Sequence, residues 1–313
     1  MTTDSIWPRT LERVTGPHPD AKIEGVAASM GDHGPTIGKL LAAGTLPPEL
    51  MTGLTLFLLS GQPRRPRPLG APNRKGAPGV SGRIWAREQQ TIVRPLRIGE
   101  AFVVEGSSSG QHVRNGRRYG TTESATVDAE GRPAATNATT GLLSYRPAPD
   151  LVDGFEGLDP ATRALPRPDF EAAARNPHLD ALATAEVGEE LGGTPVTVTL
   201  AMMAARDTSD PNNPIHSDPE AAKAAGLAKP IAGGDHVLAF ALEKVMARFG
   251  AEVLLHGTCL DTRWKAPTEC DVAIVPRARV TEVRADRVAI DYEVVLESGP
   301  TAMKGALVIP RPS

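Results

Sequence analysis

The stretch "DPNNPIHSDPEAAKAAGLAKPIAGGDHVLAFALEKVMARFG", residues 210–250, decides the fold of this chain. Its last part, 236–250, carries apolar side chains at helical spacing and stops at Gly250, which predicts a long buried helix. Before it, "SDPEAAKAAG" predicts a short helix with Ser217 or Asp218 as its cap. Residues 210–214, at the start of the stretch, are all Asp, Asn or Pro, a composition typical of a rigid turn.

The rest of the chain repeats one order of elements. In the first half, an apolar pattern at 47–61 predicts a helix, and strand-like runs follow at 83–93, 100–110, 117–131 and 133–147. In the second half, a strand is expected at 194–205 before the long helix, and three more after it, at 260–269, 271–286 and 287–310. One long helix followed by an antiparallel meander, twice over, predicts an α+β architecture.

Composition suggests where the two domains divide. Residues 1–150 are expected to form an N-terminal domain and 186–313 a C-terminal domain. Between them, 151–185 is polar and rich in proline, so we expect a linker that lies over the surface.

Charge and cysteine content exclude several classes of protein. The net charge of −3 argues against a nucleic-acid partner, and no apolar run is long enough to predict a membrane span. The N-terminus lacks the basic start and apolar run of a secretory signal. Two cysteines, Cys259 and Cys270, without a histidine in register predict no metal site and no structural disulfide. A cytoplasmic protein is expected.

His216 is the strongest candidate for chemistry. It follows Pro214 and Ile215, which restrict the local backbone and thus the direction of the ring. A carboxylate and an imidazole a few residues apart can hold one water molecule, as needed to add water to an activated double bond or remove it. The free backbone N–H groups at the start of the long helix could bind a developing oxyanion.

The strings "NPIHSD" (213–218) and "KPIAGG" (229–234) resemble the signature of the MaoC-like family, the R-specific enoyl-CoA hydratases and dehydratases. The 18-residue interval from His216 to Gly234 is also that of the family. The resemblance implies a double hot-dog fold, in which an antiparallel sheet wraps around a long central helix in each half. Since 1–150 contains no NPIH-like string, the N-terminal domain is expected to lack the catalytic motif.

The resemblance also implies roles for single residues. An aspartate and His216 would activate the water and handle the proton at the α-carbon. The Gly234 N–H would polarise the thioester carbonyl, and Asn213 would support the loop. The family aspartate falls on Pro211, which can do no proton chemistry, so Asp210 is the candidate acid.

The start of the long helix departs from the family too. Gly233 stands where the family usually has histidine, and Asp235 and His236 follow Gly234. Gly233, Asp235 and His236 are candidates for substrate binding. The ordinary alternatives are a helix N-cap for Asp235 and a solvated or core position for His236.

Cationic residues are candidates for phosphate contact, because CoA carries phosphate groups. They are Arg263 and Lys265 near the expected strand at 260–269, and a basic loop of Arg64, Arg65, Arg67, Arg74 and Lys75. Trp85 and Trp264 occupy matching places in the two halves and are expected to be packing residues.

These features together predict a hydratase or dehydratase that acts on a thioester of CoA or acyl carrier protein. No metal or redox cofactor is implied, and a homodimer is possible. Two alternatives stay open. The altered motif could serve dehydration, isomerisation or cyclisation in a specialised pathway. Alternatively, the chain could be a non-catalytic acyl-binding or assembly subunit.

Overall fold

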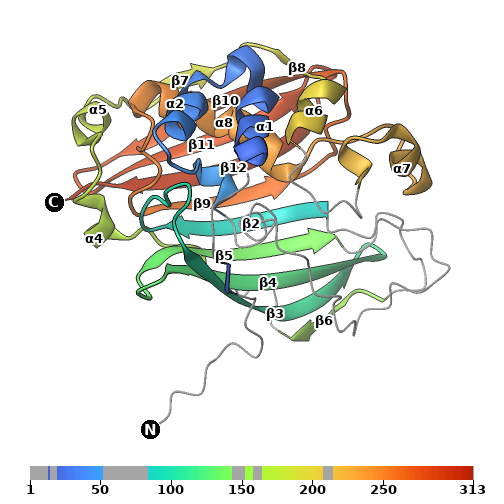
Figure 1. Ribbon diagram of the computed structural model, residues 1–313, viewed down its shortest axis with the longest axis horizontal. Coiled ribbons are helices and arrows are strands. Elements are labelled where there is room, and N and C mark those ends of the chain that lie inside the picture. The colour runs from blue at the N-terminus through green and yellow to red at the C-terminus, as the bar shows by residue number, and fades with distance from the viewer. Residues whose placement is uncertain are drawn as a thin grey trace, which may run out of the picture.

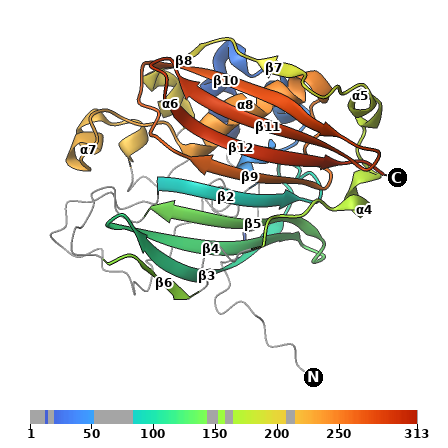
Figure 2. The ribbon, with the colours of Figure 1, turned by 180° about the vertical axis from the view of Figure 1, so that it is seen from behind.

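The computed structural model describes residues 13–14, 20–51, 84–142, 152–157, 164–206 and 214–312. Within these residues the strands form one curved antiparallel sheet, and most of the helices cover one face of its second half (Figure 1). Seen from behind, the strands of that half lie in front of the helices (Figure 2). None of the helices described is long and apolar enough to cross a bilayer.

The sheet joins strands from both halves of the chain. Its order is β1-β3-β4-β5-β2-β9-β12-β11-β10-β7, with β6 beside β3 and β8 beside β10. The strands of the first half are β1 (Arg13–Val14), β2 (Ile84–Ile92), β3 (Phe102–Arg114), β4 (Arg117–Asp128), β5 (Pro133–Leu142) and β6 (Gly154–Gly157). Those of the second are β7 (Glu190–Gly192), β8 (Val196–Val198), β9 (Thr258–Trp264), β10 (Val272–Val283), β11 (Arg287–Leu296) and β12 (Thr301–Pro310).

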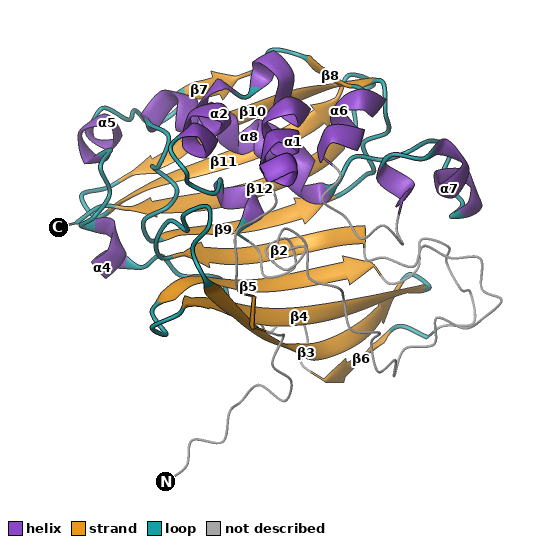
Figure 3. Cartoon of the chain, in the orientation of Figure 1, coloured by secondary structure: helices purple, strands orange, loops and turns teal. Residues whose placement is uncertain are grey.

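Helices gather on the inner face of the sheet (Figure 3). The longest is α8 (Gly234–Phe249), which confirms the helix expected at 236–250. The others are α1 (Asp20–Met30), α2 (Pro35–Ala42), α4 (Phe170–Ala173), α5 (Leu179–Ala183), α6 (Leu200–Arg206) and α7 (Pro219–Ala224), with 3-10 turns η1 (Gly31–His33), η2 (Pro48–Leu50) and η3 (Pro214–His216).

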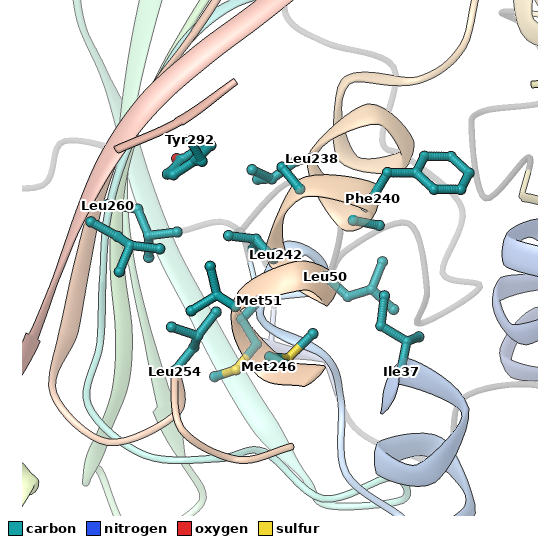
Figure 4. Close-up of a cluster of buried hydrophobic side chains, with 14 of the residues drawn as sticks. Ile37, Leu50, Met51, Leu238, Phe240, Leu242, Met246, Leu254, Leu260 and Tyr292 are labelled. Atoms are coloured by element: carbon teal, nitrogen blue, oxygen red, sulfur yellow. The ribbon is translucent and has the colours of Figure 1, made fainter. Parts of the chain in front are cut away.

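The core forms around α8. Leu238, Leu242 and Met246 are almost fully buried, as a helix apolar on most of its circumference requires. Figure 4 shows this cluster, with Leu260 and Tyr292 on the sheet and Ile37, Leu50 and Met51 from the first half around the helix. Because residues before position 52 bury this helix, the first half of the chain contributes directly to the core of the second.

The two halves meet where β2 pairs with β9. The antiparallel register places Glu88 opposite Thr262 and Gln90 opposite Leu260. Arg87 on β2 donates from Nε to the carboxylate of Asp261 on β9 at 2.8 Å. The ladder therefore passes from one half to the other without a free strand edge.

Two expectations about strands are wrong. The run at 287–310 is two strands, because a turn around Gly299, whose φ is +106°, separates β11 from β12. The strand expected at 194–205 is only β8, since the apolar residues after it form α6. The four strands expected at 83–147 are confirmed as β2 to β5. Of the helix expected at 47–61, only residues 47–51 lie within the described residues, and they form the 3-10 turn η2 and its two flanking residues.

The segment expected to be a linker contains packed helices in its second part. Ala172 and Ala173 of α4 and Leu182 of α5 have no exposed surface. The Asp169 N–H donates to the carbonyl of Gly257 at 2.8 Å, which attaches this segment to the end of the sheet. Residues 169–182 are thus part of the packed structure, because their short helices bury apolar side chains.

Candidate active site

A small separate core fixes the loop that carries His216. Ile215 is buried with Ala222, Leu227 and Ile231, away from the main core. Asp218 caps α7, since its carboxylate accepts the N–H of Glu220 at 2.8 Å and that of Ala221 at 3.2 Å. This cap is one of the two expected, and it fixes the chain directly after η3.

The ring of His216 is oriented by one hydrogen bond. Its Nδ1 lies 2.7 Å from the carbonyl oxygen of Ile231. A carbonyl can only accept, so Nδ1 donates, and in the neutral tautomer with this bond the lone pair is on Nε2. A half-buried imidazole oriented through Nδ1 is suited to accept a proton from water at Nε2.

The segment between His216 and α8 is bonded on both sides. The Ile231 N–H donates to the carbonyl of Ile215 at 3.3 Å, and the Ala232 N–H donates to that of Thr268 at 2.8 Å. The imidazole is therefore connected to the first turn of α8 through the hydrogen-bonded backbone of residues 231–233.

Helix α8 begins with two glycines. Gly233 is the N-cap, with φ −59° and ψ 148°, and Gly234 is the first helical residue. The first bond inside the helix runs from the Val237 N–H to the Gly233 carbonyl at 3.1 Å. The preceding amides, including that of Gly234, have no acceptor within the helix, so they are available to an anionic oxygen.

Two tryptophans enclose Gly234. Trp85 of β2 and Trp264 of β9 meet edge to face, with ring centroids 5.2 Å apart. Trp264 donates from Nε1 to the carbonyl of Gly234 at 3.2 Å. A Cβ on Gly234 would lie 2.9 Å from Trp85 and 3.2 Å from Trp264, so a larger residue does not fit. The expected packing role of both tryptophans is confirmed.

Asp235 is not the helix N-cap, so that expectation is wrong. Its carboxylate accepts from Nε of Arg206 at 3.0 Å, and Arg206 also donates to Glu49 at 3.2 Å. Arg206 and Glu49 are almost completely buried and Asp235 is 15% exposed. Burial raises the pKa of Glu49 to about 7, and Arg206 opposes this rise. Arg206 thus offsets the negative charge that Asp235 brings to the start of α8.

His236 lies in the core, which was one of the positions expected. It has no exposed surface, and its Nε2 lies 3.0 Å from the carbonyl oxygen of Ser29. Burial, with help from the positive charge of Arg206, lowers the pKa of His236 to about 4. The ring is therefore neutral at pH 7 and donates from Nε2 to the Ser29 carbonyl.

A comparison with protein families identifies the second half of the chain. Residues 183–298 match the sequence model of the MaoC-like domain. This part of the chain is a MaoC-like domain. No curated protein sequence matches the chain.

Solved structures match the whole chain. A MaoC-like dehydratase has a TM-score of 0.70 at 16% identity, with 97% of each chain covered. A MaoC-like dehydratase from Phytophthora capsici has a TM-score of 0.61 at 17% identity and covers 100% of this chain and 99% of its own. A Mycobacterium tuberculosis protein described as a double hot-dog fold has a TM-score of 0.61 at 14% identity, with 96% of each covered. The expected double hot-dog fold is thereby confirmed.

The MaoC-like domain carries His216, Gly233 and Gly234 on two adjoining segments. Asp210, Asn213 and Pro211 lie outside the described residues, so the pairing of Asp210 with His216 stays a prediction, as does the role of Asn213. Glu49 and Ser29 come from the first half, and the sequence did not single them out. Among the described residues, no group of three His, Cys, Asp or Glu is placed to hold a metal ion.

Proposed function

We propose that this chain is a hydro-lyase that adds water to, or removes it from, the 2,3-double bond of an acyl thioester. The observation that carries the proposal is the hydrogen bond from His216 Nδ1 to the carbonyl of Ile231, three residues before the first residue of α8. The reaction needs a base and a group that stabilises an oxyanion. The His216 imidazole and the N–H groups at the start of α8 are candidates for these two roles, and a hydrogen-bonded stretch of backbone connects them. The MaoC-like domain match supports the same reaction class.

In the hydration direction, His216 Nε2 takes one proton from a water molecule whose oxygen forms a bond to C3. The electron pair of the double bond moves to the thioester oxygen, where the Gly234 N–H and the helix dipole stabilise the charge. A proton then returns to C2 and restores the carbonyl. Asp210 would hold the water from the other side.

The test is hydration of crotonyl-CoA, followed as loss of the enoyl-thioester absorbance. His216→Ala should lower kcat by about 10²–10⁴, the usual contribution of a general base. Asp210→Asn should lower it too if Asp210 replaces the displaced family acid. Lys223→Ala on the exposed surface of α7 is the matched control and should keep the wild-type rate.

A specific observation favours one alternative. Pro211 occupies the place of the family acid, as expected in an acyl-binding subunit without catalysis. A wild type that binds acyl-CoA, and does not change crotonyl-CoA or longer enoyl thioesters, would support that alternative. Formation of a product other than the 3-hydroxyacyl thioester would instead indicate a specialised isomerase or cyclase.

A further inference from the structure

The inner face of the sheet changes character where the two halves of the chain meet. One row of paired residues crosses six strands, from β11 through β12, β9, β2 and β5 to β4 (Figure 1). Its members are all buried, and in order they are Ile290, Leu307, Leu260, Gln90, Asn137 and Ser124. The three apolar members pack in the core around α8. The three polar members belong to the first half, and buried polar groups need hydrogen-bond partners.

Glu88 of β2 lies in the neighbouring row of the same face. It stands opposite Thr262 of β9 on one side and Thr139 of β5 on the other. Its side chain is 1% exposed, and within the described part of the chain neither carboxyl oxygen forms a hydrogen bond of normal geometry. The hydroxyl of Thr262 is hydrogen-bonded to that of Tyr292. A buried carboxyl without a partner destabilises the fold, and a bound group that forms hydrogen bonds with it would offset this cost.

Other oxygens on this face also lack partners. Gln90 donates from Nε2 to the carbonyl of Pro48, and Asn137 donates from Nδ2 to that of Met51, both at 3.4 Å. These amides attach η2 and the residue after it to the sheet. Asn137 Oδ1 and the hydroxyl of Thr126 are buried and form no hydrogen bond among the residues that the structure describes. We use the name polar face for the side chains of Glu88, Gln90, Ser124, Thr126, Asn137 and Thr139.

The polar face continues from the candidate active site along β2. Trp85 packs against Gly234, where a Cβ would lie 2.9 Å from the ring. A shift of register between Trp85 and Arg87 lets Trp85 and Glu88 face the same side, although they are an odd number of positions apart. Three residues of a strand span about 10 Å. Trp85 is near the end of β2 and Glu88 nearer its middle, so a chain that leads inward from Gly234 along β2 reaches Glu88.

The chemistry of the polar face matches a neutral hydroxyl group. Burial raises the pKa of Glu88 to about 8, and the hydroxyl of Thr139 opposes this rise. At pH 7 the carboxyl is therefore mostly protonated, so it can donate one hydrogen bond and accept another. The unpaired oxygen of the Asn137 amide can only accept. A hydroxyl group both donates and accepts, which complements these two side chains.

We propose that the polar face binds a hydroxylated part of the acyl group while the thioester lies at His216 and Gly234. The proposal rests on the proposed function and names its substrate class, an acyl thioester that carries a hydroxyl group on the chain, remote from the thioester. A plain alkyl chain at this place leaves Glu88 and Asn137 without partners. A site built to hydrogen-bond a hydroxyl group rejects the analogue without it for this reason.

The experiment compares two substrates of equal length, 8-hydroxyoct-2-enoyl-CoA and non-2-enoyl-CoA, in which a methyl group replaces the hydroxyl. With carbon–carbon bonds of about 1.5 Å, each extended chain spans on the order of 10 Å. Wild type should hydrate the hydroxylated substrate with a kcat/KM about tenfold higher or more, because the methyl group leaves buried polar groups unpaired. Glu88→Leu should abolish this preference. Glu88→Gln keeps a hydrogen-bonding group and should retain part of it.

Gln89→Leu serves as the matched control. Gln89 is the next residue of β2, so it points to the opposite face of the sheet, where it donates to the carbonyl of Ala164 at 3.5 Å. The preference of this variant should equal that of wild type. Calorimetric titration with the saturated thioesters 8-hydroxyoctanoyl-CoA and nonanoyl-CoA makes the same comparison without turnover.

The outcomes separate this proposal from the proposed function. Tighter binding of the hydroxylated chain by wild type, lost in Glu88→Leu and kept in Gln89→Leu, supports the proposal even if neither enoyl thioester is hydrated, which would reject only the proposed function. Equal binding of both chains by wild type, binding of neither chain, or an unchanged preference in Glu88→Leu would overturn it. If Glu88→Leu does not fold, Thr139→Val takes its place, because it removes the hydroxyl beside Glu88 at nearly equal volume and should lower the preference.

Discussion

Arg206 at the end of α6 donates to Asp235 in the first turn of α8 at 3.0 Å, and this contact is almost closed to solvent. Arg206 is also the last described residue before Pro214, which begins the turn that carries His216. One guanidinium therefore links the end of α6, the start of α8 and, through Glu49, the first half of the chain.

Removal of this guanidinium should destabilise the fold strongly. Arg206→Met leaves the buried carboxyl of Glu49 and the half-buried one of Asp235 without their partner, and the loss of a buried partner typically costs about 3–5 kcal/mol of the free energy of unfolding. Urea denaturation followed by circular dichroism measures the loss. Arg248→Met breaks a more exposed pair with Glu189 and should cost about 1 kcal/mol or less. Equal losses in the two variants would contradict a special role for the buried network.

The pH dependence of stability should report Glu88. Burial raises the pKa of this carboxyl to about 8, and the hydroxyl of Thr139 opposes the rise. Between the ordinary glutamate pKa and about 8, the folded chain keeps a proton that the unfolded chain releases, so this contribution to stability is lost as pH rises. The stability of wild type relative to Glu88→Gln should fall by on the order of 3 kcal/mol from about pH 5 to pH 8.

Urea denaturation of both proteins across this pH range is the measurement. Glu49, whose pKa is also raised by burial, is present in both proteins and cancels in the difference. A difference that is flat with pH would show that Glu88 is not protonated in the fold.

Glu243 of α8 should contribute stability as a cap for another helix. Its two carboxylate oxygens accept the N–H groups of Thr36 and Ile37 at 2.8 and 2.9 Å, at the start of α2. Glu243→Gln keeps one acceptor and loses the charge, so it should cost about 1–2 kcal/mol by chemical denaturation. Glu220→Gln, on exposed α7, is the control and should change little. The prediction fails if both substitutions have the same effect.

Gly234→Ala should impair both folding and catalysis. The new methyl group would meet the rings of Trp85 and Trp264 at about 3 Å, so the start of α8 must move. We expect a loss of about 1–3 kcal/mol of stability and at least a tenfold lower rate of crotonyl-CoA hydration. Gly38→Ala in α2 meets nothing within 4 Å and is the matched control.

A second substitution makes this test specific. Trp85→Phe reduces the ring that faces Gly234, so the double variant Gly234→Ala/Trp85→Phe should regain part of the lost activity. If activity stays at the level of Gly234→Ala alone, displacement by the tryptophan is not the cause.

The sequence predicts much of the fold, because alternation and helical periodicity reflect burial within one element. Strands β2 to β5 and helix α8 follow from such local patterns. The turn around Gly299 was missed because apolar residues on both sides made 287–310 look continuous. The helix α6 was missed because its apolar run follows directly on β8.

The residues of the candidate site also fall into those that a local pattern predicts and those that it does not. His216 and Gly234 were found from a motif within one stretch of chain, whereas Glu49 lies 157 positions from its partner Arg206. Likewise, Ser29 meets His236 across 207 positions. No local pattern in the sequence indicates which distant polar groups will meet in a core, so these partners required the structure.

The junction between β2 and β9 has a further consequence for the charges that flank it. A symmetric pair of identical domains would repeat every contact across such a ladder. The register exchanges Arg87 with Arg263 and Asp261 with Gln89, so symmetry would give Arg263 an acidic partner where Gln89 stands. Because β2 and β9 are different segments of one chain, a residue on one strand can change without the same change on the other. Arg263 shares Asp261 with Arg87, at 3.9 Å and 2.5 Å respectively, so this asymmetry leaves one carboxylate between two cations at the junction.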